Sequence, residues 1–186
     1  MTDQPVDPQC EIAHSHNPQC DVAHGLAPAV KQVRTLVAVF ASPVAGHLLR
    51  YAADVGYAPV LLEPDADRAA AGSPAGVKVV SSYAECSDLD ADVVMTDHHR
   101  PELGVMLRDI LAGESNWIGL MGSPRHTGPH VAALTELGVP AAEIARVHRP
   151  IGLNIGSKAP AEIAISTIAG LIAERNGCPG GFSFSS

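Results

Sequence analysis

The sequence predicts a Rossmann-like three-layer α/β/α domain with a mostly parallel sheet, spanning residues 31–176 of the chain. Short apolar runs alternate with segments of helical periodicity, which is the pattern of βα units. A chain of 186 residues has the length of one ordinary domain. Hydrophobic residues make up 46% of it and aromatic residues 4%, so the apolar content is mainly Ala, Val, Leu and Ile, which suits helices packed on a parallel sheet.

The expected elements follow one another from residue 33. Gly56 stands at the position of a helix C′ residue, and residues 63–76, rich in Pro, Gly and Ala, are predicted to form a loop. Strands are expected at residues 33–41, 57–62, 77–81, 91–96 and 117–121, with a short strand or extended segment at 151–155. Helices are expected at residues 45–55, 83–88, 101–111, 124–137, 141–146 and 160–176.

The segment 116–137 is predicted to carry the functional site, because a buried strand runs directly into a glycine-serine turn and a helix. The strand ends at Gly122, and Ser123 is suited to cap the helix. Backbone N–H groups at a helix N-terminus attract anions, whereas the cations Arg125 and His126 in the first turn oppose the helix dipole. This conflict favours a bound phosphate over an ordinary connection. The helix is expected to bury Val131, Leu134 and Leu137.

The turn after the first strand carries part of a nucleotide-binding pattern. A dinucleotide site needs several glycines here, but the turn has Gly46 alone, beside Ser42 and His47. Glu63 ends the second strand, where an acidic residue binds a ribose hydroxyl in such sites. Ser42, Gly46, His47 and Glu63 are therefore candidate cofactor contacts, and an NAD(P)-dependent oxidoreductase remains an alternative function.

Four polar residues, Asp97, His98, His99 and Arg100, follow the fourth strand. Open α/β sheets bind their ligands at the carboxyl ends of strands. Imidazoles beside a carboxylate can bind a metal or transfer protons, or the residues can form a polar loop that caps the next helix. We expect Asp97, His98 and His99 to line the mouth of the site.

The first thirty residues form a separate, flexible segment with an internal repeat, DPQCEIAH followed by NPQCDVAH. Each copy places Cys and His four residues apart, on one face of a helix. Two thiolates and two imidazoles would suit tetrahedral zinc, and a disordered tail is the alternative. The candidate metal ligands are Cys10, His14, Cys20 and His24. A metal-binding protein that uses this repeat is a further possible function.

Composition excludes several classes of protein. A net charge of −8 without any basic run argues against binding to nucleic acid or to an anionic membrane. No apolar run approaches the roughly 18 residues of a membrane span, and the N-terminus lacks the pattern of a signal peptide. We therefore expect a cytoplasmic protein whose four cysteines are thiols or metal ligands. Residues 177–186 are rich in Gly and Ser and are expected to be a disordered tail.

Two long motifs resemble the XdhC/CoxI family. They are IGLMGSPRHT at residues 118–127, and PIGLNIG at 150–156 followed by PAEIAI at 160–165. The resemblance covers Val33 to Ala173 and corresponds to the family's carboxyl-terminal Rossmann-like domain. Family members are maturation factors of molybdenum hydroxylases such as xanthine dehydrogenase and carbon monoxide dehydrogenase. The resemblance implies a chaperone that binds molybdenum cofactor, as molybdopterin or its dinucleotide, and delivers it to an apo hydroxylase.

The resemblance also suggests roles for the candidate residues. Gly122, Ser123 and Arg125 would hold the cofactor phosphate, and Glu63 would meet a ribose or the polar edge of the pterin. The separate amino-terminal domain of longer members is not evident in the sequence, so a second chain that supplies this domain is an expected partner, and a homodimer is an alternative. No set of nucleophile, base and orienting group is visible, which favours an accessory protein over a catalyst.

Overall fold

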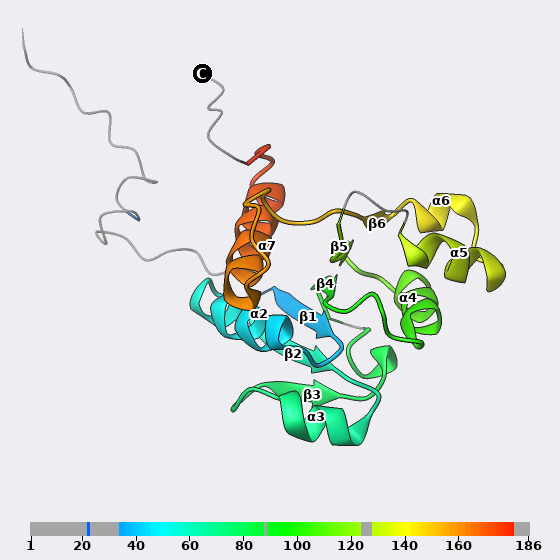
Figure 1. The fold of residues 1–186 in the computed structure, drawn as a ribbon, viewed down its shortest axis with the longest axis horizontal. Coiled ribbons are helices and arrows are strands. Elements are labelled where there is room, and N and C mark those ends of the chain that lie inside the picture. Colours follow the sequence, from blue (N-terminus) through cyan, green and yellow to red (C-terminus); the bar gives the residue numbers. More distant parts are fainter. Residues whose placement is uncertain (1–21, 23–33, 88, 124–127, 181–186) are drawn as a thin grey trace, which may run out of the picture. The chain divides into compact units, whose positions relative to one another are not determined.

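A six-stranded parallel sheet forms the centre of the domain (Figure 1). The computed structural model describes residue 22 and residues 34–87, 89–123 and 128–180. The strand order β3-β2-β1-β4-β5-β6 is that of a Rossmann fold, so the predicted fold class is confirmed. The strands are β1 (Thr35–Val39), β2 (Ala58–Leu62), β3 (Lys78–Val80), β4 (Ala91–Met95), β5 (Trp117–Leu120) and β6 (Val147–His148).

Helices cover both faces of the sheet (Figure 1). The first and last long helices, α2 and α7, pack together on one face, and α4 packs with α5 on the other. The helices are α2 (Pro43–Asp54), α3 (Ala66–Gly72), α4 (Leu103–Leu111), α5 (Pro129–Glu136), α6 (Ala141–Ile144) and α7 (Pro160–Arg175), with a 3-10 turn η1 (Tyr83–Glu85). These three layers match the predicted architecture.

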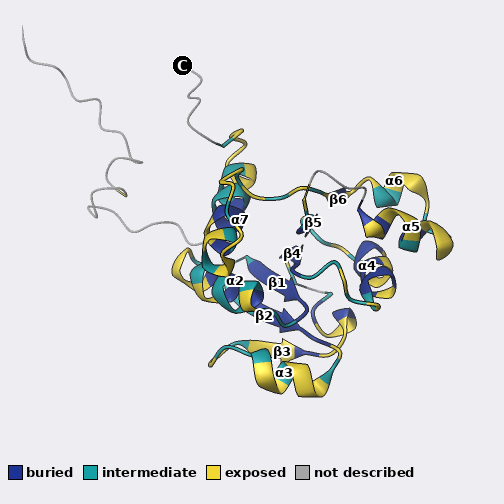
Figure 2. Cartoon of the chain, viewed as in Figure 1, coloured by how far each residue is buried: buried dark blue, intermediate teal, exposed yellow. Residues whose placement is uncertain are grey.

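The alternation of side chains along the strands divides the core into two halves. In β1, Leu36 and Ala38 pack with α2 and α7, whereas Val37 and Val39 pack with α4. All residues of β1 and β4 are buried. Figure 2 shows these buried strands between helices whose outer surfaces are exposed. Both faces of the central strands are therefore buried and, apart from Thr35 and Asp92, apolar, as is typical of a parallel sheet.

Two segments differ from the prediction. Residues 66–72 form α3 instead of a loop, because Asp65 caps this helix by accepting a hydrogen bond from the Arg68 N–H at 3.0 Å. The sixth strand is Val147–His148 instead of residues 151–155. Within the latter segment, Gly152 has a φ of +79°, which interrupts an extended chain.

The segment after β6 is held against α7 by close backbone contacts. The Leu153 N–H donates to the Ser166 carbonyl oxygen at 3.2 Å, and Ser166 Oγ donates to the Leu153 carbonyl oxygen at 2.6 Å. A Cβ placed on Gly170 would lie 3.0 Å from the Cα of Gly152, so the two glycines allow this approach. The glycine-rich run at residues 150–156 therefore has a packing role on α7.

The helix predicted to follow Ser123 begins instead at Pro129. Its N-cap is Gly128, which has extended backbone angles. Residues 124–127, which include the candidate contacts Arg125 and His126, lie outside the described part of the chain. Ser123 is thus not the cap of α5, although it follows β5 as expected.

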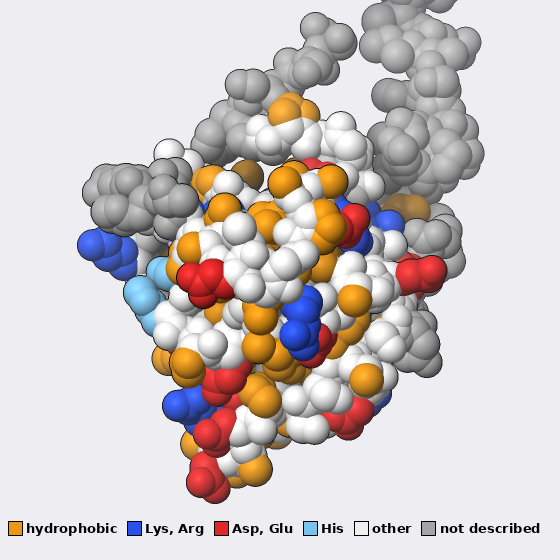
Figure 3. Space-filling model, turned by 90° about the vertical axis from the view of Figure 1, so that its right-hand side faces the viewer, with side chains coloured by type: hydrophobic (Ala, Val, Ile, Leu, Met, Phe, Trp, Pro, Cys, Tyr) orange, Lys and Arg blue, Asp and Glu red, His pale blue; other side chains and the backbone are white. Residues whose placement is uncertain are grey.

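The buried face of α5 also differs from the predicted stripe. Leu134 is fully buried, but Val131 and Leu137 are 40% and 39% exposed. His130 is buried instead, with 6% of its surface exposed. Figure 3 views the molecule from the side of α4, α5 and α6 and shows hydrophobic side chains at the surface among charged ones. The predicted stripe of Val131, Leu134 and Leu137 was wrong because His130, a polar residue outside that stripe, occupies an interior position.

Helix α2 begins at Pro43, before the predicted start at residue 45, and Ser42 is its N-cap. The Ser42 Oγ accepts a hydrogen bond from the Ala45 N–H at 3.0 Å, and Gly56 follows the helix with a φ of +91°. Gly46 lies inside the helix, and a Cβ added there would meet no atom within 4 Å. A side chain at this position would therefore clash with no other residue.

The Gly46→Ala variant is expected to raise the free energy of unfolding by about 0.5–1 kcal/mol, because alanine has the higher helix propensity and finds open space. Urea denaturation would measure the change. Gly76→Ala is the matched control: it also meets open space, but at a φ of +78°, so it should lower stability. A loss of stability in Gly46→Ala would contradict the helical assignment of this turn.

The chain divides into two units, Met1–Gln32 and Val33–Ser186. In the first unit the structure describes Val22, which is helical and exposed. The predicted metal ligands lie outside the described residues, namely Cys10, His14, Cys20 and His24. No helix in the described ranges combines the length and the apolar character of a membrane-crossing segment.

Candidate functional site

A buried ion pair lies at the carboxyl ends of β2 and β4. Each carboxylate oxygen of Glu63 accepts a hydrogen bond from the Arg100 guanidinium, and both bonds are 3.0 Å long. The carboxylate also accepts hydrogen bonds from the backbone N–H groups of Ala41, at 2.8 Å, and Asp65, at 3.1 Å. The Glu63 side chain is fully buried. Burial alone would raise the pKa of Glu63, but the hydrogen bonds from Arg100 and the backbone outweigh it and lower the pKa. The Glu63 carboxylate is thus engaged within the chain, and its contact with a ribose or pterin stays a prediction.

The turn between β1 and α2 is also occupied by the chain's own side chains. Phe40 adopts a φ of +73°, a conformation that favours glycine, and the Arg100 guanidinium lies 4.5 Å from the centre of its buried ring. The Ser42 Oγ donates to Thr96 Oγ1 at 3.1 Å, and Thr96 Oγ1 donates to the Phe40 carbonyl oxygen at 2.7 Å. Ser42, a predicted cofactor contact, therefore links β1 to β4.

Gly46 and His47, two more predicted contacts, line a cavity of about 490 Å³ beside α2. Residues 71–75, at the end of α3, form its other side. His47 Nδ1 accepts a hydrogen bond from the Arg50 guanidinium at 2.7 Å, so two basic side chains share this surface. The structure thus places these residues on the outer side of α2, whereas Ser42 points to β4.

Asp97, His98 and His99 lie at the carboxyl edge of the sheet, as predicted. The Asp97 carboxylate accepts a hydrogen bond from the His99 N–H at 2.9 Å, and the two imidazole rings lie 4.1 Å apart. The backbone of Met121, which follows β5, lies close enough to His98 to favour the charged form of its imidazole. His98 therefore extends from the end of β4 toward the end of β5.

The turn after β5 is covered by Arg149, which follows β6. The Arg149 guanidinium donates to the Ser123 carbonyl oxygen at 2.8 Å. A Cβ placed on Gly122 would lie 2.7 Å from Arg149 Nε and 2.8 Å from one of its terminal nitrogens, so the guanidinium packs directly on the Gly122 backbone. Gly122 and Ser123, two predicted phosphate contacts, are thus joined to an arginine that the sequence interpretation did not select.

His130 lies next to Arg149 at the N-terminus of α5. A Cβ placed on Gly128 would be 2.4 Å from His130 Nδ1 and 3.1 Å from Arg149 Cδ. His130 Nδ1 is buried and has no hydrogen-bond partner among the described residues. The carboxyl edge of β4, β5 and β6 therefore brings together two imidazoles, a guanidinium and two glycine backbones.

Burial and positive neighbours keep both imidazoles neutral. Burial lowers the pKa of His98, and His99 and Arg149 lower it further, against an opposing effect of Asp97. Burial also lowers the pKa of His130, again together with Arg149. The site thus has one permanent positive charge and two groups that gain a charge when a nearby negative charge raises their pKa.

The free energy of unfolding is expected to fall as the pH is lowered from 7.5 to 5.5. The folded-state pKa values of His98 and His130 lie below the unfolded value, so the unfolded chain binds more protons in this range and stability rises with pH. The slope is at most about 1.4 kcal/mol per pH unit for each group. Urea titrations should show a smaller slope for His130→Gln, and an unchanged slope would contradict the assignment.

Three residues that shape the site were missed in the sequence. Arg149 follows β6 directly, and Arg100 ends the polar run after β4; both positions point to the carboxyl edge and would have identified these residues. His130 follows Pro129 at the start of α5, but its burial depends on tertiary packing that no local pattern reveals. In the described part of the chain, no group of three or more His, Cys, Asp or Glu residues is arranged to hold a metal ion.

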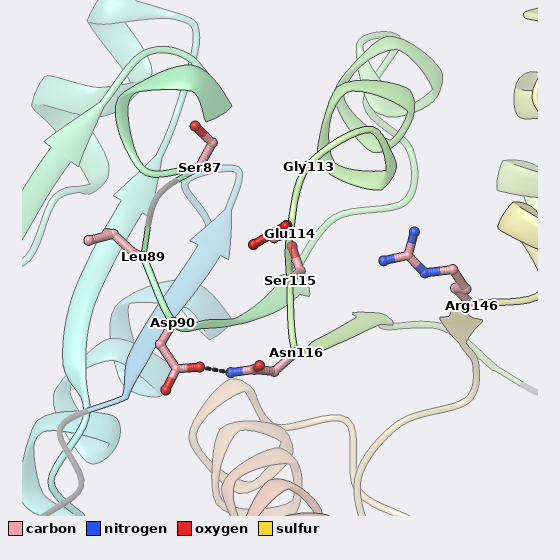
Figure 4. Close-up of a pocket in the computed structure, with 8 residues that line it drawn as sticks. All are labelled: Ser87, Leu89, Asp90, Gly113, Glu114, Ser115, Asn116 and Arg146. Atoms are coloured by element: carbon pink, nitrogen blue, oxygen red, sulfur yellow. Dashed lines mark hydrogen bonds between the residues drawn. The ribbon is translucent and has the colours of Figure 1, made fainter.

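A second cavity of about 490 Å³ lies at the opposite, amino-terminal edge of the sheet (Figure 4). Asp90 and Asn116 precede β4 and β5, and their side chains are hydrogen-bonded across the cavity floor. Arg146 lies on the other side and pairs with Glu143 at 2.6 Å. Rossmann folds bind ligands at the carboxyl edge, so this cavity is not the candidate site.

Comparison with known proteins decides the family. The model of the XdhC Rossmann domain matches residues 36–171. The chain belongs to the XdhC family. This XdhC domain is 45% identical over 65 residues to the uncharacterized protein YqeB of Escherichia coli strain K12; the match covers 35% of this chain and 12% of that protein.

A solved structure shares the fold of this XdhC domain. It is the crystal structure of a protein described as a xanthine dehydrogenase from Bacillus halodurans, with a TM-score of 0.58 and 21% identity. The match covers 81% of this chain and 45% of that one. The XdhC domain described here thus spans less than half the length of either relative.

Proposed function

We propose that this XdhC domain binds molybdenum cofactor and serves in the maturation of a molybdenum hydroxylase such as xanthine or carbon monoxide dehydrogenase. Membership of the XdhC family carries the proposal. The solved relative described as a xanthine dehydrogenase agrees with it. The partner is the apo hydroxylase, and the setting is the cytoplasm.

The residues at the carboxyl edge of β4–β6 fit the phosphate end of this cofactor. His130 Nδ1, which is buried and has no hydrogen-bond partner among the described residues, and the glycine cradle of Gly122 and Gly128 offer donors and space for an anion. In this proposal the Gly122 and Ser123 backbone and Arg149 hold the phosphate, and Asp97, His98 and His99 form the rim. The cofactor supplies redox-active molybdenum to the client enzyme.

The NAD(P)-dependent alternative finds no support in these contacts. Glu63, the residue suited to a ribose hydroxyl, is held by Arg100, and Phe40 takes the left-handed backbone position of a glycine. A zinc-binding role of the Cys/His repeat rests on residues outside the described ranges. We therefore keep the accessory role as the proposal.

A test of the maturation role compares an apo xanthine dehydrogenase produced in one host with and without this chain. Molybdenum content per purified hydroxylase and its activity are the two measurements. Both are expected to be higher when the chain is present, because it would deliver the cofactor. Equal metal content and activity in the two preparations would contradict the proposal.

A further inference from the structure

We propose that His130 and Arg149, over the backbones of Gly122 and Gly128, form a binding site for a phosphate group, and that binding is coupled to proton uptake. The inference deepens the proposed function, since it names the residues that would hold the phosphate end of the cofactor. The inference depends on the proposed function only for the identity of the molecule that carries the phosphate. The geometry of the site is independent of it.

The first observation is the N-terminus of α5. Its N-cap, Gly128, has no side chain to accept a hydrogen bond from the first turn, and the first turn contains no acidic residue. The Val131 N–H reaches the Gly128 carbonyl oxygen at 3.2 Å. Such a helix end carries partial positive charge that a bound anion stabilises.

The second, independent observation is the buried imidazole of His130. With 6% of the residue exposed, its Nδ1 atom makes no hydrogen bond to any described residue. This atom faces Gly128, at 2.4 Å from the position of a Cβ there. Buried polar atoms in folded proteins nearly always have a partner. A ligand oxygen at the N-terminus of α5 would provide one.

The third observation is the position of Arg149. Its guanidinium lies against Gly122 and its stem lies against Gly128, so the same side chain borders both glycines. A planar guanidinium can donate two parallel hydrogen bonds to a phosphate, and glycine lets the phosphate approach the backbone. The three donors converge from α5, the β5 turn and the end of β6.

Proton coupling follows from the charges around the imidazoles. His130 is influenced by Arg149, and His98 by His99, Arg149 and Asp97. On the helices beside α5, charged side chains pair locally, Arg108 with Asp109 on α4 and Arg146 with Glu143 at α6. A dianion between His130 and Arg149 would favour the charged imidazole. Binding should therefore be tighter at pH 6 than at pH 8.

Isothermal titration of the full chain with inorganic pyrophosphate and with sulfate tests the site. Pyrophosphate resembles the phosphate groups of a nucleotide or pterin cofactor, and sulfate keeps the same charge at pH 6 and pH 8. We expect saturable binding of both, stronger sulfate binding at pH 6, and proton uptake seen as heat that depends on the buffer. In Arg149→Gln and in His130→Gln, affinity should fall at least about tenfold, since each variant removes a hydrogen bond to a charged group.

Arg108→Gln is the matched control, because it removes an exposed arginine of α4 and should leave binding unchanged. If Arg149→Gln does not fold, the affinities of Arg149→Lys and His130→Gln are the test of the site. Absence of binding in the wild-type chain, or unchanged binding in folded His130 and Arg149 variants, would overturn the site. If the chain binds phosphate but carries no pterin, the phosphate site stands and its ligand is free phosphate or a nucleotide. If both variants retain pterin, the proposed function stands but the cofactor does not use this site.

Discussion

Glu63→Gln is expected to lower the free energy of unfolding by about 3–5 kcal/mol, because it removes the buried counter-charge of the Arg100 guanidinium and leaves that guanidinium with the half-exposed carboxylate of Glu102. The Arg100 side chain is 8% exposed and that of Glu63 is fully buried, so water cannot replace the lost interaction. The same change weakens the acceptor for the Ala41 N–H, which holds the turn after β1. Denaturation in urea at pH 7 would measure the loss.

Glu102→Gln provides the control for Glu63→Gln. Glu102 also pairs with Arg100, at 3.2 Å, but its side chain is 37% exposed, so its loss should cost less than about 1 kcal/mol. Because the folded-state pKa of Glu63 is lowered, its contribution is present at neutral pH and is lost as the pH falls below its ordinary value. Equal losses in the two variants would show that the buried pair does not stabilise the sheet edge.

Gly152→Ala is expected to lower the free energy of unfolding by about 2–4 kcal/mol. At a φ of +79° an alanine is strained, and its Cβ would lie 2.7 Å from Ser166 Oγ and 3.1 Å from the backbone of Ser166. The Ser166 Oγ would have to leave the Leu153 carbonyl oxygen, which it contacts at 2.6 Å. Chemical denaturation and amide exchange at Leu153 would report both effects.

Gly156→Ala separates backbone strain from crowding. Gly156 has a φ of +69° but open space around its Cβ position, so alanine should cost only about 1–2 kcal/mol. A Gly152→Ala variant no less stable than Gly156→Ala would contradict the role of residues 150–156 as a segment packed on α7.

The order of strands and helices could be predicted from the sequence because each buried strand is a short apolar run. The run at residues 91–96 and the proline that opens the helix at Pro160 are clear local signals. The helix at residues 66–72 was missed because its alanines and flanking Gly and Pro resembled a loop, although Asp65 is a good N-cap. Local signals are thus sufficient where an element has a regular pattern and a clear boundary.

The candidate site could be predicted only in part. The carboxyl edge after β4 and β5 was identified from Asp97, His98 and the Gly122 turn, because parallel strands end on one side. The engagement of Glu63 was not predicted, because its partner Arg100 is 37 residues away in the chain and the pair forms only in the folded sheet. The same is true of Arg149 and Gly122, which meet through the pairing of β5 with β6.

The most direct test of cofactor binding is the pterin content of the chain purified from a host that makes molybdenum cofactor. The protein is denatured, the released material is oxidised, and pterin fluorescence is measured per mole of chain, with a host unable to make the cofactor as control. We predict a stoichiometric signal from the first host and none from the second. A folded chain from the first host without pterin would contradict the proposal.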